Sequence, residues 1–170
     1  MMNILITYYS KTENTEKVAY SIKEGLSGEN VVIKPVAEID PLTLHSYDLV
    51  ILGSGIYASR IDKSIIQLIK KAPNLPRRFA YFCTHASLDF YQKPFDKVTK
   101  ILNENECSIT GEFDCIGENI GIPMEKRLEM IDQLPESERK KAKENMQKIK
   151  GRPNTEDLKK AKKFGFSLIK

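Results

Sequence analysis

The chain is poor in the residues that build disulfide frameworks and metal centres. It has 170 residues, no tryptophan, two histidines and three cysteines. Cys83, Cys107 and Cys115 form no C-x-x-C pair, and His45 and His85 lie in separate segments, so no metal-ligand cluster is visible. An odd number of cysteines, two of them inside apolar runs, is typical of buried thiols in a reducing compartment. We therefore expect a cytoplasmic protein without a bound metal.

Long apolar runs are missing as well. No stretch approaches the roughly 20 apolar residues of a membrane-spanning helix, and the N-terminus lacks the basic, apolar and small-residue pattern of a secretion signal. The shares of hydrophobic residues (41%) and charged residues (29%) are ordinary for a globular protein. A chain of 170 residues can bury a sizeable core, and we expect one domain over residues 1–170.

The net charge of +4 is unevenly distributed. Residues 1–117 hold 13 Lys and Arg against 14 Asp and Glu, whereas residues 118–170 hold 14 against 9. Most of the basic excess lies between Arg139 and Lys163. It is either the solvated face of helices or a contact region for an acidic partner or an anionic membrane surface. No aromatic residue interrupts this region, so we expect no nucleic-acid binding by base stacking.

Hydrophobic patterning predicts an α/β fold. Apolar, β-branched runs predict five strands, at about 3–8, 31–36, 48–53, 78–83 and 109–116. Helical spacing predicts helices at about 15–27, 62–72 and 91–105, and a last helix that starts at Pro153–Asp157. This alternation favours a doubly wound parallel sheet. The polar residues 118–150 carry helical signals around 124–134 and 136–149, and we interpret them as a helical insertion after the fifth strand.

The end of the first strand is rich in phosphate-binding groups. The strand stops at a hydroxyl-rich turn and a helix follows at once. Such a turn offers free backbone N–H groups, hydroxyls and the positive end of a helix dipole. A helix N-cap would need one such residue, whereas this turn has four within six positions. The turn therefore predicts an anion site made of Ser10, Lys11, Thr12, Glu13, Asn14 and Thr15.

Two further loops follow strand ends. The segment Gly53–Ala58 fits the G-x-G-x-x-A dinucleotide pattern, but the next strand ends without the acidic residue that a nicotinamide site requires. We interpret this segment as a glycine-rich loop that approaches a flat ligand closely and changes conformation at little cost. Tyr57 at its tip, with Phe90 or Tyr91 of the loop 84–91, could sandwich an aromatic ring system. His85 in that loop is either a proton carrier or an ordinary loop residue.

Taken together, the three loops resemble the flavodoxin family over residues 1–117 and the last helix. Ser10, Thr12 and Thr15 are similar to the family's T/S-x-T-G-x-T phosphate loop, Asp48–Tyr57 resembles its first flavin-flanking loop, and Thr84–Tyr91 takes the place of the second. The resemblance implies a five-stranded sheet of order 2-1-3-4-5 and one FMN bound without a covalent bond. Beyond the first loop, the site residues that it implies are Ser54, Gly55, Ile56, Tyr57, Thr84, His85, Ala86, Ser87 and Tyr91.

The sequence departs from the family pattern in three places. Glu13 stands where the family usually has glycine, the chain is net basic where flavodoxin electron carriers are acidic, and residues 118–150 are added. We therefore weigh three functions. The first is an FMN electron carrier between cytoplasmic redox partners, which are proteins or small-molecule acceptors. The second is an oxidoreductase acting on a planar substrate, such as a protoporphyrinogen oxidase or a quinone reductase. The third is a cofactor-free binding module. No residue is assigned as catalytic.

Overall fold

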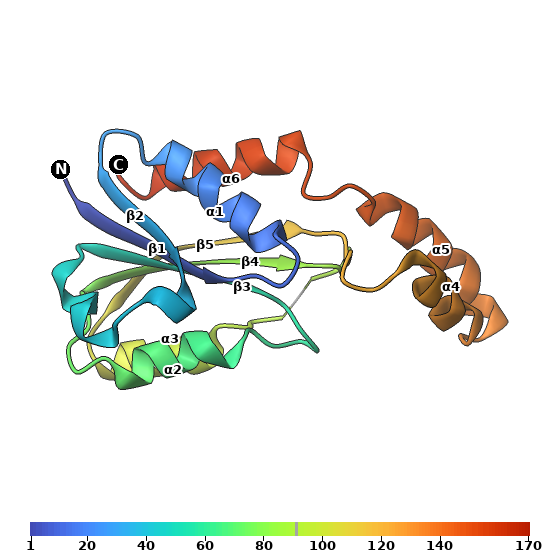
Figure 1. The fold of residues 1–170 in the computed structure, drawn as a ribbon, viewed down its shortest axis with the longest axis horizontal. Coiled ribbons are helices and arrows are strands. Elements are labelled where there is room, and N and C mark those ends of the chain that lie inside the picture. The colour runs from blue at the N-terminus through green and yellow to red at the C-terminus, as the bar shows by residue number, and fades with distance from the viewer. Residues whose placement is uncertain (91) are drawn as a thin grey trace.

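A five-stranded parallel sheet forms the centre of the part of the chain that the computed structural model describes, residues 1–90 and 92–170 (Figure 1). The strands are adjacent in the order β2-β1-β3-β4-β5. The prediction of a doubly wound sheet with order 2-1-3-4-5 is confirmed. Their bounds are β1 (Asn3–Tyr9), β2 (Asn30–Pro35), β3 (Leu49–Gly55), β4 (Arg78–His85) and β5 (Ser108–Ile116).

Helices cover both faces of the sheet (Figure 1). Helices α1 (Asn14–Gly25) and α6 (Thr155–Ser167) lie side by side on one face, and α2 (Lys63–Lys71) and α3 (Asp96–Glu104) cover the other. Two short 3₁₀ helices, η1 (Val36–Glu38) and η2 (Pro41–Ser46), connect β2 to β3 where the sequence left no room for a crossover helix.

Alternation along the strands divides the core into two layers. In β1, Leu5 packs with the cluster beneath α2 and α3, whereas Ile4 and Ile6 pack with the cluster beneath α1 and α6. Within the described part of the chain, all three cysteines are free and buried in these layers or at their edges. Burial raises the pKa of all three thiols, and that of Cys115 to about 12.

The predicted ends of two strands are wrong. Strands β3 and β4 each run two residues further than expected, and the register pairs Gly53 with Phe82 and Gly55 with Thr84. Gly53 and Gly55 are therefore buried strand residues and do not form a flexible loop. A Cβ on Gly53 would lie 2.0 Å from the Phe82 ring, so the glycine is required by close packing.

Helix α3 begins at Asp96 and not near residue 91. Pro94 explains the late start, because proline disfavours the helical conformation in the residue before it and cannot serve in a helix interior. The third loop is longer as a result.

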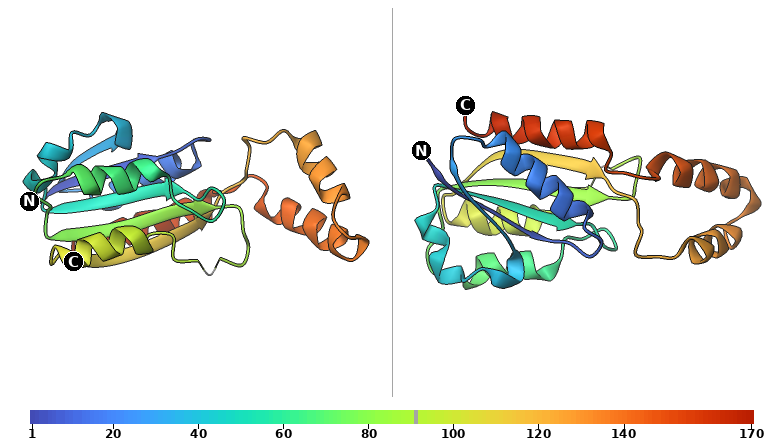
Figure 2. Two further views of the ribbon diagram at one scale, coloured as in Figure 1. Left: turned by 90° about the horizontal axis from the view of Figure 1, so that it is seen from below. Right: turned by 45° about the horizontal axis from the view of Figure 1, so that its top comes forward.

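The predicted insertion is a helical hairpin that projects from the carboxyl end of the sheet (Figure 2). It consists of α4 (Met124–Asp132) and α5 (Glu136–Ile149), and neither of these fully described helices has a buried residue. Within residues 1–90 and 92–170, we find no helix that combines the length and the apolar character needed to cross a membrane.

Where the chain leaves the hairpin and rejoins the sheet, the N-terminus of α6 is firmly capped. The Asn154 side chain accepts the N–H of Asp157, and the Asp157 carboxylate accepts the N–H of Asn154, which is a complete capping box. Arg152 also donates to Asp157. Burial alone would raise the pKa of the Asp157 carboxyl, but the hydrogen bonds from Arg152 and Asn154 outweigh it and lower that pKa.

Candidate functional site

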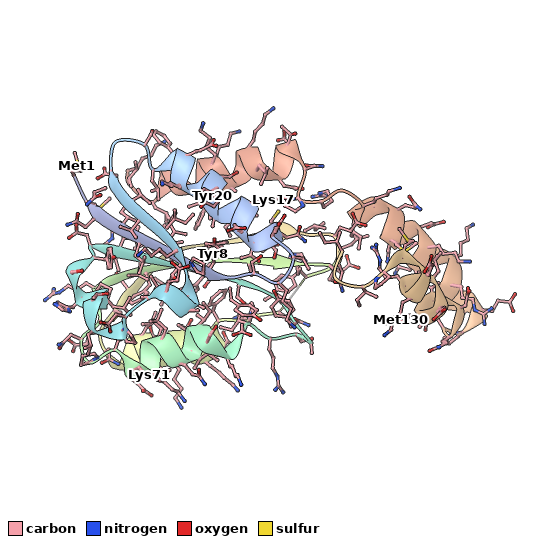
Figure 3. All side chains as sticks on the ribbon, in the orientation of Figure 1. Met1, Tyr8, Lys17, Tyr20, Lys71 and Met130 are labelled. Atoms are coloured by element: carbon pink, nitrogen blue, oxygen red, sulfur yellow. The ribbon has the colours of Figure 1, made fainter. Side chains whose placement is uncertain are left out.

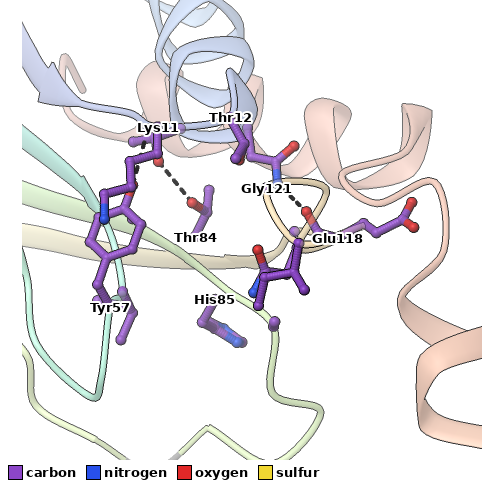
Figure 4. Close-up of a pocket in the computed structure, with 15 residues that line it drawn as sticks. Lys11, Thr12, Tyr57, Thr84, His85, Glu118 and Gly121 are labelled. Carbon is purple, nitrogen blue, oxygen red and sulfur yellow. Dashed lines mark hydrogen bonds between the residues drawn. The ribbon is translucent and has the colours of Figure 1, made fainter. Parts of the chain in front are cut away.

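A cavity of about 540 Å³ lies at the carboxyl end of the sheet, where ligands bind in open parallel sheets (Figure 4). Four segments form its walls: the first loop, the end of β3, the end of β4 and the segment after β5. The lining residues are Lys11, Thr12, Asn14, Thr15, Gly55, Ile56, Tyr57, Thr84, His85, Ala86, Gly117, Glu118, Asn119, Gly121 and Ile122. The structure thus brings most of the predicted site residues to one place.

The first loop presents an uncapped helix end to this cavity. No side chain within the described residues caps the first turn of α1, so its N–H groups and positive dipole are available to an anion. Glu13 at the N-cap has φ 64°, the left-handed region that glycine adopts most easily. Glycine, which the family usually has at this place, adopts this backbone conformation without strain, whereas Glu13 adopts it under strain.

Two hydrogen bonds fix the first loop to neighbouring walls. The hydroxyls of Thr15 and Thr84 are 2.8 Å apart in the core of the site. The Asn14 side-chain N–H donates to the carbonyl of Glu118 at 2.8 Å. Asn14 is therefore used to hold the segment after β5 against the loop.

Tyr57 closes over the first loop. Its hydroxyl accepts the backbone N–H of Lys11 at 3.1 Å, and the Lys11 ammonium lies 4.6 Å from the centre of its ring. Burial raises the pKa of the Tyr57 phenol. The chain reverses directly after Tyr57, with Ala58 and Ser59 at φ 46° and 65°. Two adjacent non-glycine residues in this region are strained, and the strain lies at the tip of the loop that carries the tyrosine.

His85 is held rigidly at the end of β4. Its Nε2 lies 2.9 Å from an Asp114 carboxylate oxygen and its Nδ1 lies 2.8 Å from the Ser87 carbonyl. Its ring stacks on Phe90 at 4.0 Å between centroids. Both partners are hydrogen-bond acceptors, and together with Phe90 they fix the orientation of the ring. The ring is a fixed wall of the cavity.

A second cavity of about 400 Å³ adjoins the first. Ile56, His85 and Ala86 line both, and residues 87–90 complete the second together with Asn145 of α5. The insertion therefore reaches the third loop, which no sequence pattern indicated.

Four predicted residues lie elsewhere. The Ser54 hydroxyl is buried, donates to the Gly55 carbonyl and accepts the N–H of Asp62, the N-cap of α2. Ser10 and Glu13 line a smaller cavity that lies next to the first loop, and the buried Ser10 hydroxyl has no hydrogen-bond partner among the described residues. Ser87 lines only the second of the two main cavities. Tyr91 lies outside the described residues.

Sequence reasoning missed the segment after β5. Gly117, Glu118 and Gly121 line the main cavity because the carboxyl ends of all parallel strands meet at one edge. A Cβ on Gly117 would lie 2.7 Å from the Asn14 side-chain nitrogen, so this glycine permits the close contact with the first loop. Gly117 directly after the last strand and Gly121 four residues later were the available signal.

Glu118 fastens the base of the hairpin. One carboxylate oxygen accepts from Arg127 of α4 at 3.1 Å, and the other accepts the N–H of Gly151, just after α5, at 2.8 Å. The Glu118 and Arg127 side chains are only 13% and 15% exposed, respectively. The Gly151 hydrogen bond, followed by the one from Arg127, lowers the pKa of the Glu118 carboxyl.

We expect Glu118→Gln to loosen the hairpin. The amide supplies one acceptor where the carboxylate supplies two, so amide-exchange protection over residues 124–149 should fall about tenfold at pH 7. The folded-state pKa is lowered, so the stabilisation by Glu118 exists above the unfolded-state pKa of about 4.3 and disappears as the pH falls through the lower folded value. Hydrogen exchange followed by mass spectrometry measures this. Unchanged protection at pH 7 would contradict the role given to Glu118.

Comparison with known proteins decides the family. The sequence model of the flavodoxin domain matches residues 5–165. The chain belongs to the flavodoxin family. This flavodoxin-family chain is 31% identical over 172 residues to the uncharacterized protein MJ0298 of Methanocaldococcus jannaschii, with 99% of each chain covered. It is 26% identical to the flavodoxin-like domain-containing protein BilS of Clostridioides difficile, covering 99% of this chain and 97% of BilS.

Solved flavodoxins share the fold of this family member at low sequence identity. Oxidised flavodoxin 1 of Bacillus cereus superposes with a TM-score of 0.65 at 14% identity and covers 98% of this chain and 97% of its own. A flavoprotein from Lactobacillus acidophilus, solved in complex with FMN, gives a TM-score of 0.51 at 18% identity and covers 67% of this chain and 93% of its own. These likenesses show the fold.

Proposed function

We propose that this protein binds FMN in the main cavity and carries electrons between redox partners in the cytoplasm. One observation carries the proposal: the uncapped start of α1 stands at a cavity whose other walls are the ends of β3 and β4. Family membership and the FMN complex of the Lactobacillus acidophilus flavoprotein support it.

The residues present fit a phosphate at one end of the cavity. The first-turn N–H groups of α1 and the Thr12 and Thr15 side chains would hold it, and Lys11 adds a positive charge. The buried Ser10 hydroxyl, unpartnered among the described residues, belongs to the same loop but lines the neighbouring smaller cavity. To use the N–H of Lys11 as well, the Tyr57 hydroxyl has to release it.

The remaining walls fit a flat ring system. Ile56 and Tyr57 follow β3, and His85 and Ala86 lie at the end of β4, so the two pairs lie at neighbouring strand ends. When bound, FMN supplies one- and two-electron redox chemistry. The chain supplies binding, orientation and charge. The ring of His85 contributes to orientation, because hydrogen bonds to Asp114 and Ser87 hold it in place.

Two measurements test the proposal. The purified protein should be yellow, and apoprotein should quench the fluorescence of added FMN with a stoichiometry of about one to one. The reduced holoprotein should then pass electrons to an oxidised acceptor such as cytochrome c. A colourless protein that leaves FMN fluorescence unchanged would contradict the proposal and favour a cofactor-free binding module.

A second candidate function is favoured by the adjoining cavity. Its volume of about 400 Å³, next to His85 and closed partly by Asn145 of the insertion, provides room for a planar substrate beside the ring site. The protein would then be an oxidoreductase acting on a quinone or porphyrinogen. Steady-state turnover that depends on such a substrate and falls in Asn145→Leu would support this function over a carrier.

A further inference from the structure

The outer face of α6 carries a dense and unbalanced positive charge. After the first turn of α6, which holds Glu156 and Asp157, residues 158–170 contain five lysines and no acidic residue, and Lys170 lies just past the end of the helix. The inner face of the helix is already used, because Ala161, Gly165 and Leu168 are buried against the body. Lys159, Lys160, Lys162 and Lys163 are exposed, so they form the outer surface of a helix whose other face packs against the body.

One aromatic side chain stands exposed within this charged face. Phe166 is 52% exposed, although it is large and apolar, and the ammonium of Lys170 lies 4.5 Å from its ring centre. Figure 3 shows Tyr20 and Lys17 on α1 beside α6, with Lys71 on the opposite side of the molecule.

A groove runs along the junction between α1 and α6 on this face. It has a volume of about 320 Å³, and its walls include Lys159, Lys163 and Phe166 above the bare backbone of Gly25. A single acidic group reaches it within the described residues: Glu24, which pairs with Lys162 at 3.4 Å with both side chains more than half exposed. We call the exposed face of α6 together with this groove the α1–α6 face.

We infer that the α1–α6 face docks on an anionic lipid bilayer. Lysines flanking an exposed aromatic ring on an amphipathic helix are typical of helices that lie at a membrane interface. Each lysine near an anionic leaflet attracts it, and the aromatic ring enters the headgroup layer. Because the apolar face of α6 is part of the core, the attraction is electrostatic and reversible.

Other macromolecular partners fit this face less well. Lysine is depleted in protein–protein interfaces, where arginine and aromatic residues dominate, yet all five basic residues between 158 and 170 are lysines. The same stretch has no arginine for bidentate contacts to guanine.

This assignment does not depend on FMN and has a consequence for orientation. The α1–α6 face lies on one side of the sheet, whereas the main cavity lies at the carboxyl end of the strands (Figure 1). When the protein docks by this face, its main cavity opens parallel to the bilayer surface. A second membrane-bound protein or a ligand from solution can then reach the cavity.

Co-sedimentation with vesicles tests the inference. The full-length protein should bind vesicles of 70% phosphatidylcholine and 30% phosphatidylglycerol at low salt, and should not bind pure phosphatidylcholine. Lys159→Gln with Lys163→Gln should lower the partition coefficient about twenty-fivefold, which is about fivefold for each lysine. Binding should also be lost at 0.5 M salt, because screening shortens the range of these charges.

Two further variants locate the contact. Lys97→Gln with Lys100→Gln removes the same charge from exposed positions of α3, on the opposite face of the sheet, and should leave partitioning within about twofold. Phe166→Trp introduces the only tryptophan of the chain, and its emission should shift to the blue on anionic vesicles alone.

Three outcomes would overturn the inference. The first is no binding to anionic vesicles at low salt. The second is an equal loss of vesicle binding in the α3 variant, which would show that binding depends on the net charge of the protein and not on the α1–α6 face. The third is binding to a DNA duplex, sensitive to Lys159 and Lys163, without vesicle binding, which would make the face a nucleic-acid surface.

Discussion

Gly165→Ala is expected to lower the free energy of unfolding by about 2 kcal/mol. A Cβ at this position of α6 would lie 2.2 Å from the carbonyl oxygen of Ile22 and 3.3 Å from the Cα of Gly25, both in α1. Backbone atoms cannot rotate away, so the helices must separate and open the core beneath them. Overpacking of this kind costs up to about 3 kcal/mol, and the better helix propensity of alanine returns about 1 kcal/mol.

A glycine that faces the same helix provides the control. At Gly111 in β5, a Cβ would meet only the ends of the Phe164 and Leu168 side chains, at 2.9 and 3.1 Å. Those ends can shift, so Gly111→Ala should change stability by less than about 1 kcal/mol. Thermal unfolding should show a loss of about 6 °C for Gly165→Ala. Equal effects at the two positions would show that the backbone contact between α1 and α6 has no special cost.

Glu13→Gly is expected to improve both stability and FMN binding. Glycine relieves the left-handed conformation at φ 64°, which should add about 1 kcal/mol to the free energy of unfolding. Removing the carboxylate from a loop that receives a phosphate should tighten FMN binding about threefold at low salt. Urea unfolding of the apoprotein and fluorescence titration with FMN measure the two effects separately.

The chain contains a matched control for the backbone effect. Glu106 is also an exposed glutamate with positive φ, 56°, but it precedes β5 at the opposite end of the sheet. Glu106→Gly should gain similar stability and leave FMN affinity unchanged. Glu13→Gln keeps the strained backbone and removes the charge, so it should tighten FMN binding and change stability by less than about 0.5 kcal/mol. If Glu13→Gln left FMN affinity unchanged while Glu13→Gly raised it, the electrostatic explanation would be wrong.

Local sequence patterns were sufficient for the elements that determine the fold. The continuous apolar run of β1 and the hydroxyl-rich turn after it identified the first strand and the first helix, because strand period, helix spacing and capping chemistry agree there. The anion site at their junction stays a prediction. Asn154 and Asp157 likewise marked the start of α6 by their spacing alone.

What could not be predicted depends on contacts between distant segments. The extension of β3 through Gly55 follows from pairing with β4 and from the ring of Phe82, which fills the space over Gly53. The place of Glu118 in the cavity wall depends on Asn14, more than a hundred residues earlier. The approach of Asn145 to the third loop depends on how the hairpin projects from its base. None of these contacts leaves a periodic signal in the sequence.

The central claim is that the first loop holds a phosphate, and the most direct test compares FMN with riboflavin, which has the same ring system without the phosphate. Calorimetric titration of the apoprotein should give an affinity for FMN at least about a hundredfold higher, because several charge-assisted hydrogen bonds to the phosphate are lost with riboflavin. Equal affinities for the two flavins would contradict the account.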